Sequence, residues 1–228
     1  QTIAGFAAMT FENIDYSLYL VTDRGLSRGR KTLEIVAAAV NGGATVVQLR
    51  EKACSTLEFI HQALSINAFL KTRGIPLIIN DRLDVAQAVA ADGVHLGQKD
   101  MPLETAKGIL GDTMIIGISA ESLADAIAAE KGGADYLGVS PIYTTPTKTD
   151  TAPAIGLEGL REIRRAVRLP LVGIGGLNRA NAAEVIRNGA DGVAVVSAIV
   201  AADNPEAAAR ELRQVINEAR QHEPERNR

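Results

Sequence analysis

The sequence has 228 residues, of which 46% are hydrophobic, 22% are charged and only 4% are aromatic, and its formal net charge is −3. This charge balance does not favour nucleic acid as a partner, and no apolar run reaches the length needed to cross a membrane. The single cysteine excludes an internal disulfide framework and favours a reducing compartment, so we expect a cytoplasmic protein.

Short apolar runs alternate with helical patterns along the whole chain. The expected strands are residues 18–22, 45–49, 76–80, 93–96, 114–118, 135–139, 170–174 and 192–196. Between these runs, apolar residues recur at spacings of three and four, as they do in amphipathic helices. Eight such units in roughly 200 residues predict an α/β protein, a single-domain (β/α)8 TIM barrel. A doubly wound open sheet is the alternative, although no G-x-G-x-x-G motif follows the first strand.

The same short sequence pattern precedes several of the expected strands. In NGGATVVQL, AADGVHLG, KGGADYLGV and NGADGVAVV, a helix end is followed by a glycine turn, a small or acidic residue and a strand. No linker divides the chain, so we expect one barrel domain at residues 17–220, after an N-terminal extension at 1–16 and before a charged tail at 221–228. Because aromatic residues are few, we expect aliphatic residues and alanine to fill the interior.

Polar residues collect just after the expected strands. In a barrel of this type the active site is built from the loops at the C-terminal ends of the strands. The segments found there are QLREK (48–52), NDR (80–82), GQKD (97–100), GISAES (117–122), GIGG (173–176) and VVSAI (195–199). A long polar loop follows the sixth strand and holds Lys148 among hydroxyl residues; loops of that length are usually functional or disordered. The pattern predicts a binding site at this rim.

The GIGG and VVSAI segments predict a phosphate site. In many barrels of this type, the loops after the seventh and eighth strands bind phosphate with the help of a short helix N-terminus. Glycines allow backbone N–H groups to approach an anion, and Ser197 is expected to cap the helix and to donate a hydroxyl. The alternative is a tight turn followed by an ordinary helix cap.

Asp81 and Asp100 end neighbouring strands and are expected to face the same side of the rim. Two carboxylates without a nearby cluster of His or Cys favour a hard cation such as Mg²⁺. An equally good alternative is that Asp81 pairs with Arg82 or Arg50, while Asp100 caps the helix that begins near Pro102.

Three cationic residues, Arg50, Lys52 and Lys148, add positive charge beside that pair of aspartates. They would neutralise a diphosphate if a metal were present, and the alternative is a solvated charged surface. His95 lies within the fourth strand, where we expect a core or supporting histidine rather than a catalytic one.

Together, several of these segments resemble the thiamine phosphate synthase family. They are YLVTD, VVQLREK, LIINDR, GVHLGQKD, DYLGVSPIYTTPTK, VGIGG and GVAVVSAI. The resemblance runs from about Leu18 to Ile199, with the motifs in the family's order and at similar intervals. It is specific, because unrelated phosphate-binding barrels share only the GIGG and final-loop features.

The resemblance implies a transferase with Mg²⁺ as its cofactor. This enzyme would join 4-amino-2-methyl-5-(diphosphooxymethyl)pyrimidine to a thiazole phosphate and release diphosphate. Its partners would be these small-molecule substrates, with no nucleic acid and no membrane; a homo-oligomer is left open. The alternatives are a thiazole tautomerase-like isomerase, which would need acid–base residues that this rim barely offers, and a non-catalytic phosphate-binding barrel.

Carried over residue by residue, the resemblance implies three sets of site residues. The pyrimidine diphosphate set is Gln48, Leu49, Arg50, Glu51, Lys52, Asn80, Ser119 and Lys148, of which Ser119 and Lys148 are also the implied catalytic residues. The thiazole phosphate set is Thr145, Pro146, Thr147, Gly176, Val196 and Ser197, and the implied metal ligands are Asp81 and Asp100. In one departure, the chain has Ala120 and Glu121 where members of the family often have a histidine.

Overall fold

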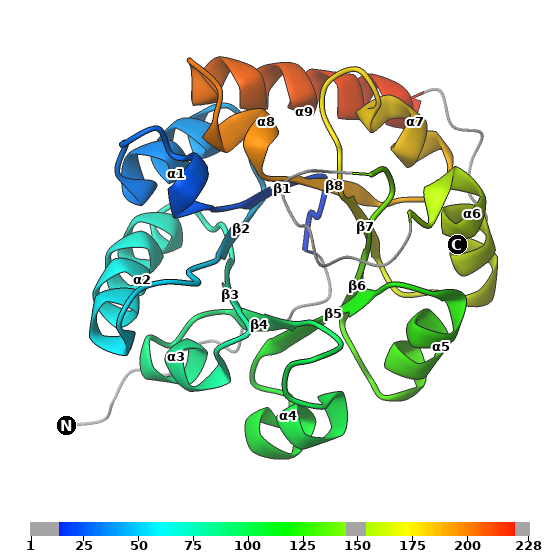
Figure 1. Ribbon diagram of the computed structural model, residues 1–228, viewed down its shortest axis with the longest axis horizontal. Coiled ribbons are helices and arrows are strands. Elements are labelled where there is room, and N and C mark those ends of the chain that lie inside the picture. The colour runs from blue at the N-terminus through cyan, green and yellow to red at the C-terminus, as the bar shows by residue number, and fades with distance from the viewer. Residues whose placement is uncertain (1–13, 145–153, 222–228) are drawn as a thin grey trace.

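The computed structural model describes residues 14–144 and 154–221, which form a closed barrel of eight parallel strands inside a ring of helices (Figure 1). The strands are β1 (Leu18–Val21), β2 (Val46–Leu49), β3 (Leu77–Asn80), β4 (Gly93–Leu96), β5 (Ile115–Ala120), β6 (Tyr136–Val139), β7 (Leu171–Ile174) and β8 (Gly192–Val195). Each strand pairs with the next in sequence order, and β8 closes the barrel against β1. The prediction of a (β/α)8 barrel is confirmed, and the open sheet is excluded.

Helices cover the outside of the barrel. They are α1 (Thr32–Asn41), α2 (Thr56–Lys71), α3 (Leu83–Ala88), α4 (Leu103–Leu110), α5 (Leu123–Lys131), α6 (Gly156–Ala166), α7 (Ala182–Arg187), α8 (Ser197–Val200) and α9 (Pro205–Gln221), with a 3-10 helix η2 (Arg24–Leu26) after β1. The last helix, α9, packs against both α1 and α7, and so it covers the place where β8 meets β1 (Figure 1). No helix in the described parts of the chain is both long and apolar enough to span a membrane.

Two of the helices begin at serine caps. Ser55 precedes α2, and its hydroxyl accepts a hydrogen bond from the N–H of Glu58 at 3.2 Å. Ser122 precedes α5 and accepts from the N–H of Asp125 at 3.1 Å. Each bond satisfies a donor that the first turn of a helix leaves unpaired, and a cap of this kind typically contributes about 1 kcal/mol.

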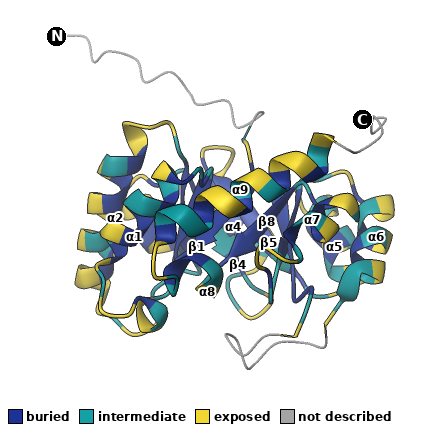
Figure 2. Cartoon of the chain, turned by 90° about the horizontal axis from the view of Figure 1, so that it is seen from above, coloured by how far each residue is buried: buried dark blue, intermediate teal, exposed yellow. Residues whose placement is uncertain are grey.

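The pleat of the strands separates two hydrophobic layers, because successive side chains point to opposite faces. On β1, Leu18 and Leu20 point outward to the helices, and Tyr19 points into the barrel. Figure 2 shows the resulting buried band along the strands and the inner faces of the helices. The outer layer is aliphatic, as expected. The inner layer is also largely aliphatic, but it holds three of the four tyrosines, Tyr16, Tyr19 and Tyr136, which the expectation of an aliphatic interior did not include.

Glycines on neighbouring strands make room for the rings inside the barrel. Gly117 on β5 pairs with Tyr136 on β6, and a Cβ at Gly117 would come within 2.1 Å of the Tyr136 ring. In the same way, a Cβ at Gly138 would lie 2.9 Å from the His95 ring. Since contacts this short are not tolerated in packed interiors, both rings depend on these glycines for their positions.

The small or acidic residue that recurs before the strands has a structural role at the N-terminal rim. Each of four such side chains accepts a hydrogen bond from a backbone N–H at the start of the preceding strand, at distances between 2.7 and 3.1 Å. They are Thr45, Asp92, Asp135 and Asp191. These bonds satisfy backbone donors at the strand ends. The repeat in the sequence is therefore a set of contacts that tie consecutive units together at the rim opposite the predicted site.

Candidate active site

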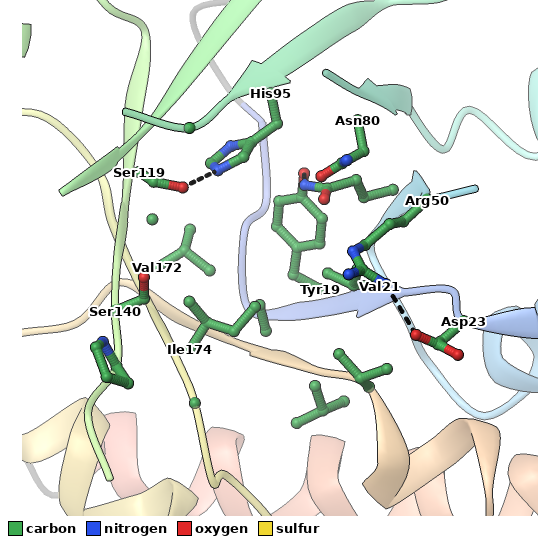
Figure 3. A pocket seen from close by; sticks show the side chains of 18 of the residues that line it. Tyr19, Val21, Asp23, Arg50, Asn80, His95, Ser119, Ser140, Val172 and Ile174 are labelled. Carbon is green, nitrogen blue, oxygen red and sulfur yellow. Dashed lines mark hydrogen bonds and ion pairs between the residues drawn. The ribbon is translucent and has the colours of Figure 1, made fainter. Parts of the chain in front are cut away.

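The C-terminal ends of the strands enclose a cavity of about 500 Å³. Side chains from strands around the whole barrel line it (Figure 3). Of the residues predicted from the sequence, those that line the cavity are Gln48, Arg50, Lys52, Asn80, Asp81, Asp100, Ser119, Gly176, Val196 and Ser197. The structure thus brings together residues that are far apart in the sequence, and their binding roles stay predictions.

Asp81 and Asp100 lie together on one side of the cavity mouth. Burial raises the pKa of Asp100; the N–H of Gly97, which donates to its carboxylate at 2.7 Å, opposes this shift, and the adjacent Asp81 carboxyl adds to it. Lys52 forms an ion pair with Asp81. Two adjacent carboxyl groups repel one another when both are ionised, unless a proton or a cation lies close to them.

One alternative for Asp100 is wrong. The position that precedes α4 is occupied by Pro102, and no side chain makes a capping hydrogen bond there. The carboxylate of Asp100 instead turns back to the N–H of Gly97, three residues earlier in the same loop. Asp100 therefore closes its own loop and is held toward the cavity, not toward the helix.

Asp81 has a left-handed backbone conformation, with φ of 62°. Aspartate and asparagine adopt this conformation more readily than other residues with a side chain. The N–H of Asp81 donates to the carbonyl of His95 at 2.9 Å, so the chain stays bonded to β4 as it leaves β3. The neighbouring Arg82 pairs with Asp84 at 2.6 Å, so the predicted alternative of an Asp81–Arg82 pair is wrong.

Arg50 does not pair with Asp81 either, because its guanidinium donates to Asp23 at 2.8 Å (Figure 3). The other carboxylate oxygen of Asp23 accepts from the N–H of Leu26 at 3.2 Å. The N–H of Arg50 donates to the hydroxyl of Thr22 at 3.0 Å. The loops after β1 and β2 therefore fix both the backbone and the head group of Arg50 on the cavity wall.

A chain of hydrogen bonds crosses the floor of the cavity. Gln48 Nε2 donates to the Tyr19 hydroxyl at 2.9 Å, and the hydroxyls of Tyr19 and Tyr136 are 2.7 Å apart. The Tyr136 hydroxyl lies 2.9 Å from Nδ1 of His95, and Nε2 of His95 lies 2.9 Å from Oγ of Ser119 (Figure 3). Burial raises the pKa of both tyrosines. His95 is thus a cavity residue that supports Ser119, in agreement with a supporting role.

The two residues at which this chain departs from the family pattern, Ala120 and Glu121, lie in different surroundings. Ala120 is fully buried in the outer hydrophobic layer, whereas Glu121 lines the cavity. The backbone of Ser119 is fixed nearby, because its carbonyl accepts from Nε2 of Gln98 at 2.5 Å. A carboxylate therefore stands at the rim where the family often has a histidine.

Backbone forms the other end of the cavity. Gly175 and Gly176 both have positive φ, 104° and 67°. A Cβ at Gly175 would lie 2.8 Å from Pro141, and one at Gly176 would lie 3.0 Å from the Cβ of Tyr143 and 3.2 Å from the carbonyl oxygen of Thr144. Only glycine fits this close approach of two loops without strain.

Ser197 is the first residue of α8 and not its cap, so the predicted capping role is wrong. Val196 occupies the capping position, and no side chain makes a capping hydrogen bond. The chain turns sharply at Val196, with φ of −112° and ψ of −85°, and the helix begins one residue earlier than expected. Ser197 is exposed and lines the cavity, so the prediction that its hydroxyl meets a ligand does not depend on a cap.

Some predicted residues do not bring side chains to the cavity. Gln48 points inward, so the pleat turns Leu49 outward, and its side chain is fully buried in the layer beneath the helices. Glu51 is also absent from the cavity lining; burial raises the pKa of its carboxyl group. The remaining predicted residues, Thr145, Pro146, Thr147 and Lys148, lie outside the described residues.

Several cavity residues were not predicted as site residues from the sequence. They include Tyr19, Asp23, Tyr136 and Ser140, and also Gln98, Lys99 and Glu121, which lie in predicted rim segments without having been singled out. The period-two alternation along β1 and β6 would have pointed to the two tyrosines, because each lies at an inward position of a short strand. Asp23 had a weaker signal, as a carboxylate that directly follows the first strand on the predicted rim.

Comparison with known proteins adds the identity of the family. A sequence profile described as thiamine monophosphate synthase matches residues 18–199, which include all eight strands. The chain is 55% identical over 204 residues to the thiamine-phosphate synthase of Chloroflexus aurantiacus, covering 90% of this chain and 94% of that protein. It is 56% identical over 200 residues to the enzyme of the same name from Albidiferax ferrireducens, covering 88% of this chain and 91% of that protein.

The structural comparison agrees with the sequence comparison. The solved structure of thiamine phosphate pyrophosphorylase from Pyrococcus furiosus is 43% identical to this chain, with a TM-score of 0.84, and the match covers 90% of this chain and 98% of that one. The same residues that build the barrel are thus the residues that match in sequence and in structure. The chain belongs to the thiamine monophosphate synthase family, whose members are transferases.

Proposed function

We propose that this enzyme transfers the pyrimidinylmethyl group of 4-amino-2-methyl-5-(diphosphooxymethyl)pyrimidine to the ring nitrogen of a thiazole phosphate. The acceptor is 4-methyl-5-(2-phosphooxyethyl)thiazole or its carboxylated tautomer. The products are thiamine phosphate and diphosphate, and the carboxylated acceptor would also release its carboxyl group as carbon dioxide. The observation that carries the proposal is a single cavity with two chemically different ends. Paired carboxylates with a lysine form one end, and glycine backbone with a serine forms the other.

The pyrimidine ring is assigned to the polar floor. Gln48 and Asn80 are both buried and line the cavity from β2 and β3, and Ser119 lines it from β5 (Figure 3 shows Asn80 and Ser119). From this position the diphosphate reaches the mouth, where Arg50 and Lys52 provide positive charge. Arg50 is well suited to phosphate oxygens, because its planar guanidinium presents several donors in a fixed geometry.

Mg²⁺ dependence is part of the proposal, and Asp81 and Asp100 fit such an ion. Their carboxyl groups are close enough that Asp81 raises the pKa of Asp100, and their oxygens are the ligands that hard cations prefer. Within the described residues, no group of three or more His, Cys, Asp or Glu side chains is placed to hold a metal. Two carboxylates are enough for Mg²⁺, which typically binds one or two of them and takes its other ligands from substrate phosphate and water. When bound, the ion would neutralise charge on the departing diphosphate.

The chemistry exchanges one bond for another at the pyrimidine methylene carbon. The carbon–oxygen bond to diphosphate breaks, and its electron pair leaves with the diphosphate. The aminopyrimidine ring stabilises the positive charge that develops on the carbon, so this bond can break before the new one is well formed. The lone pair of the thiazole nitrogen then forms the carbon–nitrogen bond. The protein's own contribution is to orient both rings and to hold the leaving anion, and no protein nucleophile is required.

The thiazole phosphate is assigned to the end formed by Gly176, Val196 and Ser197. Open backbone at glycines and the start of a helix favour an anion there. Thr145, Pro146 and Thr147 belong to the same proposed set. Lys148 is proposed to act with Ser119 in catalysis by contacting the diphosphate. Residues 145–148 lie outside the described part of the chain, so these roles rest on the family resemblance.

Ser197→Ala is expected to raise the KM for thiazole phosphate several-fold while changing the free energy of unfolding by less than about 0.5 kcal/mol. The stability effect is small because Ser197 makes no capping bond and alanine favours a helix. The two KM values and a thermal unfolding curve check this. A loss of stability near 1 kcal/mol would show that the hydroxyl does support the helix.

A coupling assay with both substrates and Mg²⁺ tests the proposed function. We expect equal amounts of thiamine phosphate and diphosphate, dependence on both substrates, and loss of turnover when a chelator removes Mg²⁺. An isomerase would interconvert thiazole tautomers without the pyrimidine substrate. A phosphate-binding barrel would bind thiazole phosphate and release no diphosphate. Either of these results would overturn the proposal.

A further inference from the structure

In the series of hydrogen bonds on the cavity floor, each group donates to the next, from Gln48 at one end to Ser119 at the other. Gln48 donates through Nε2 to the hydroxyl of Tyr19. The hydroxyls of Tyr19 and Tyr136 are 2.7 Å apart, and either could be the donor if this bond stood alone. A buried hydroxyl hydrogen needs an acceptor, and among the described residues the only acceptor within hydrogen-bond distance of the Tyr19 hydroxyl is Tyr136, because Gln48 approaches it with a donor. Tyr19 therefore donates to Tyr136, and by the same reasoning Tyr136 donates to Nδ1 of His95, 2.9 Å away. A neutral histidine that accepts at Nδ1 carries its hydrogen on Nε2, which then donates to Ser119 at 2.9 Å.

This direction fixes what the two ends of the chain present to the cavity. The amide nitrogen of Gln48 is turned toward Tyr19, so its Oε1 is turned the other way and is left as a hydrogen-bond acceptor for a ligand. Ser119 accepts from His95, so its hydroxyl hydrogen is left as a donor for a ligand. Reversing the chain would exchange these properties, with a donor at Gln48 and an acceptor at Ser119.

The middle of the chain is rigid enough to hold one direction. Tyr19 and Tyr136 are each 1% exposed, so solvent offers their hydroxyls no alternative partner. Burial raises the pKa of both, so both keep their hydrogens at neutral pH. Packing also fixes the Tyr136 ring, which lies against Gly117 on one side and has its centroid 4.8 Å from that of Tyr16.

We propose that Tyr19 and Tyr136 are positioning residues that set the donor and acceptor pattern of the pyrimidine pocket, and through it the preference for an amino ring over an oxo ring. This inference rests on the proposed function, in which an aminopyrimidine lies on this floor. The exocyclic amino group donates to Oε1 of Gln48, and an unprotonated ring nitrogen accepts from Ser119. The 4-oxo counterpart brings an acceptor against an acceptor at Gln48. Such a mismatch of buried polar groups is a strong source of discrimination.

The direction itself is measurable without any substrate. The protein has only three histidines, so nitrogen-15 NMR of histidine-labelled protein resolves each ring. The variant His95→Gln identifies which signals belong to His95. We expect the neutral form with hydrogen on Nε2 and a bare Nδ1. In Tyr136→Phe, the Nδ1 signal is expected to shift, because it loses its donor. Hydrogen on Nδ1 in the wild-type enzyme would overturn the proposal.

The consequence for specificity is measured as a ratio of dissociation constants. The probes are 4-amino-5-(hydroxymethyl)-2-methylpyrimidine and its 4-oxo counterpart. Tyr19→Phe and Tyr136→Phe are each expected to reduce the amino-to-oxo preference at least about tenfold, because the Gln48 amide can then turn its nitrogen toward the oxo group. The matched control is Tyr16→Phe. The ring of Tyr16 packs on Tyr136, but among the described residues its hydroxyl forms no hydrogen bond with Gln48, Tyr19, Tyr136, His95 or Ser119.

An unchanged preference in both variants, or an equal loss in Tyr16→Phe, would overturn the specificity role. Thermal unfolding of each variant shows that the comparison is made on folded protein. The failure of the proposed function looks different: wild-type enzyme that binds neither pyrimidine and makes no thiamine phosphate would overturn that function and the specificity claim together. The tautomer of His95 would still show whether the hydrogen bonds are donated in the direction from Gln48 to Ser119.

Discussion

Asp81→Asn and Asp100→Asn are each expected to lower kcat at least about 100-fold, the loss that follows removal of a group stabilising charge in the transition state. The reason is that the paired carboxylates are the oxygen ligands proposed for Mg²⁺, and the ion is proposed to offset charge on the leaving diphosphate. An amide keeps the shape of the side chain but removes its charge. Diphosphate release at saturating substrates, over a series of Mg²⁺ concentrations, measures the effect.

Neither substitution is expected to destabilise the fold by more than about 1 kcal/mol. Asparagine tolerates the left-handed backbone of residue 81, and the ion pair with Lys52, whose side chain is 55% exposed, belongs to a class that contributes little. The pKa of Asp100 is raised in the folded state, so above that pKa its ionisation opposes folding. Removing the charge at neutral pH therefore leaves stability unchanged or slightly increased, which thermal unfolding checks.

Asp84→Asn is the matched control. Asp84 lies in the first turn of α3, close in sequence to Asp81, and its carboxylate pairs with Arg82 rather than facing the cavity. It should keep nearly full activity. If Asp81→Asn or Asp100→Asn instead unfolds readily while retaining activity per folded molecule, the pair is structural and the metal assignment is wrong.

The fold could be predicted because each unit repeats the same local signals. The expected ends of all eight strands lie within two residues of the observed ends. The largest difference is at β5, which continues to Ala120. Its last residues form backbone pairs with Gly138 and Val139 of β6. Such an extension depends on a neighbouring strand that is distant in the sequence, so local periodicity does not reveal it.

The site was predicted less completely, for a related physical reason. Motifs on the rim identify which loops carry polar groups, but partners across strands depend on register. Arg50 meets Asp23 because Gln48 pairs with Val21, and this alignment is not visible in either segment alone. The outward position of Leu49 was within reach of the sequence, since an inward Gln48 dictates it by alternation.

Gly176→Ala is expected to raise the KM for thiazole phosphate at least about tenfold more than the KM for the pyrimidine diphosphate. The added methyl group would lie 3.0 Å from the Cβ of Tyr143 and 3.2 Å from the carbonyl oxygen of Thr144, so the two loops at this end must move apart. The phosphate proposed to bind at this end would then be held less accurately, and the accuracy of positioning strongly affects the rate. Steady-state kinetics with each substrate varied in turn measures the difference.

Gly74→Ala separates crowding from backbone strain. Gly74 has φ of 64°, close to the 67° of Gly176, but a Cβ there meets no atom within 4 Å. Both substitutions should lose about 1–2 kcal/mol of stability from the left-handed conformation. Only Gly176→Ala should also change the kinetics, because only its methyl group presses on loops that line the cavity. Equal increases in both KM values, or the same kinetic change in Gly74→Ala, would show that this end of the cavity is not a dedicated thiazole phosphate site.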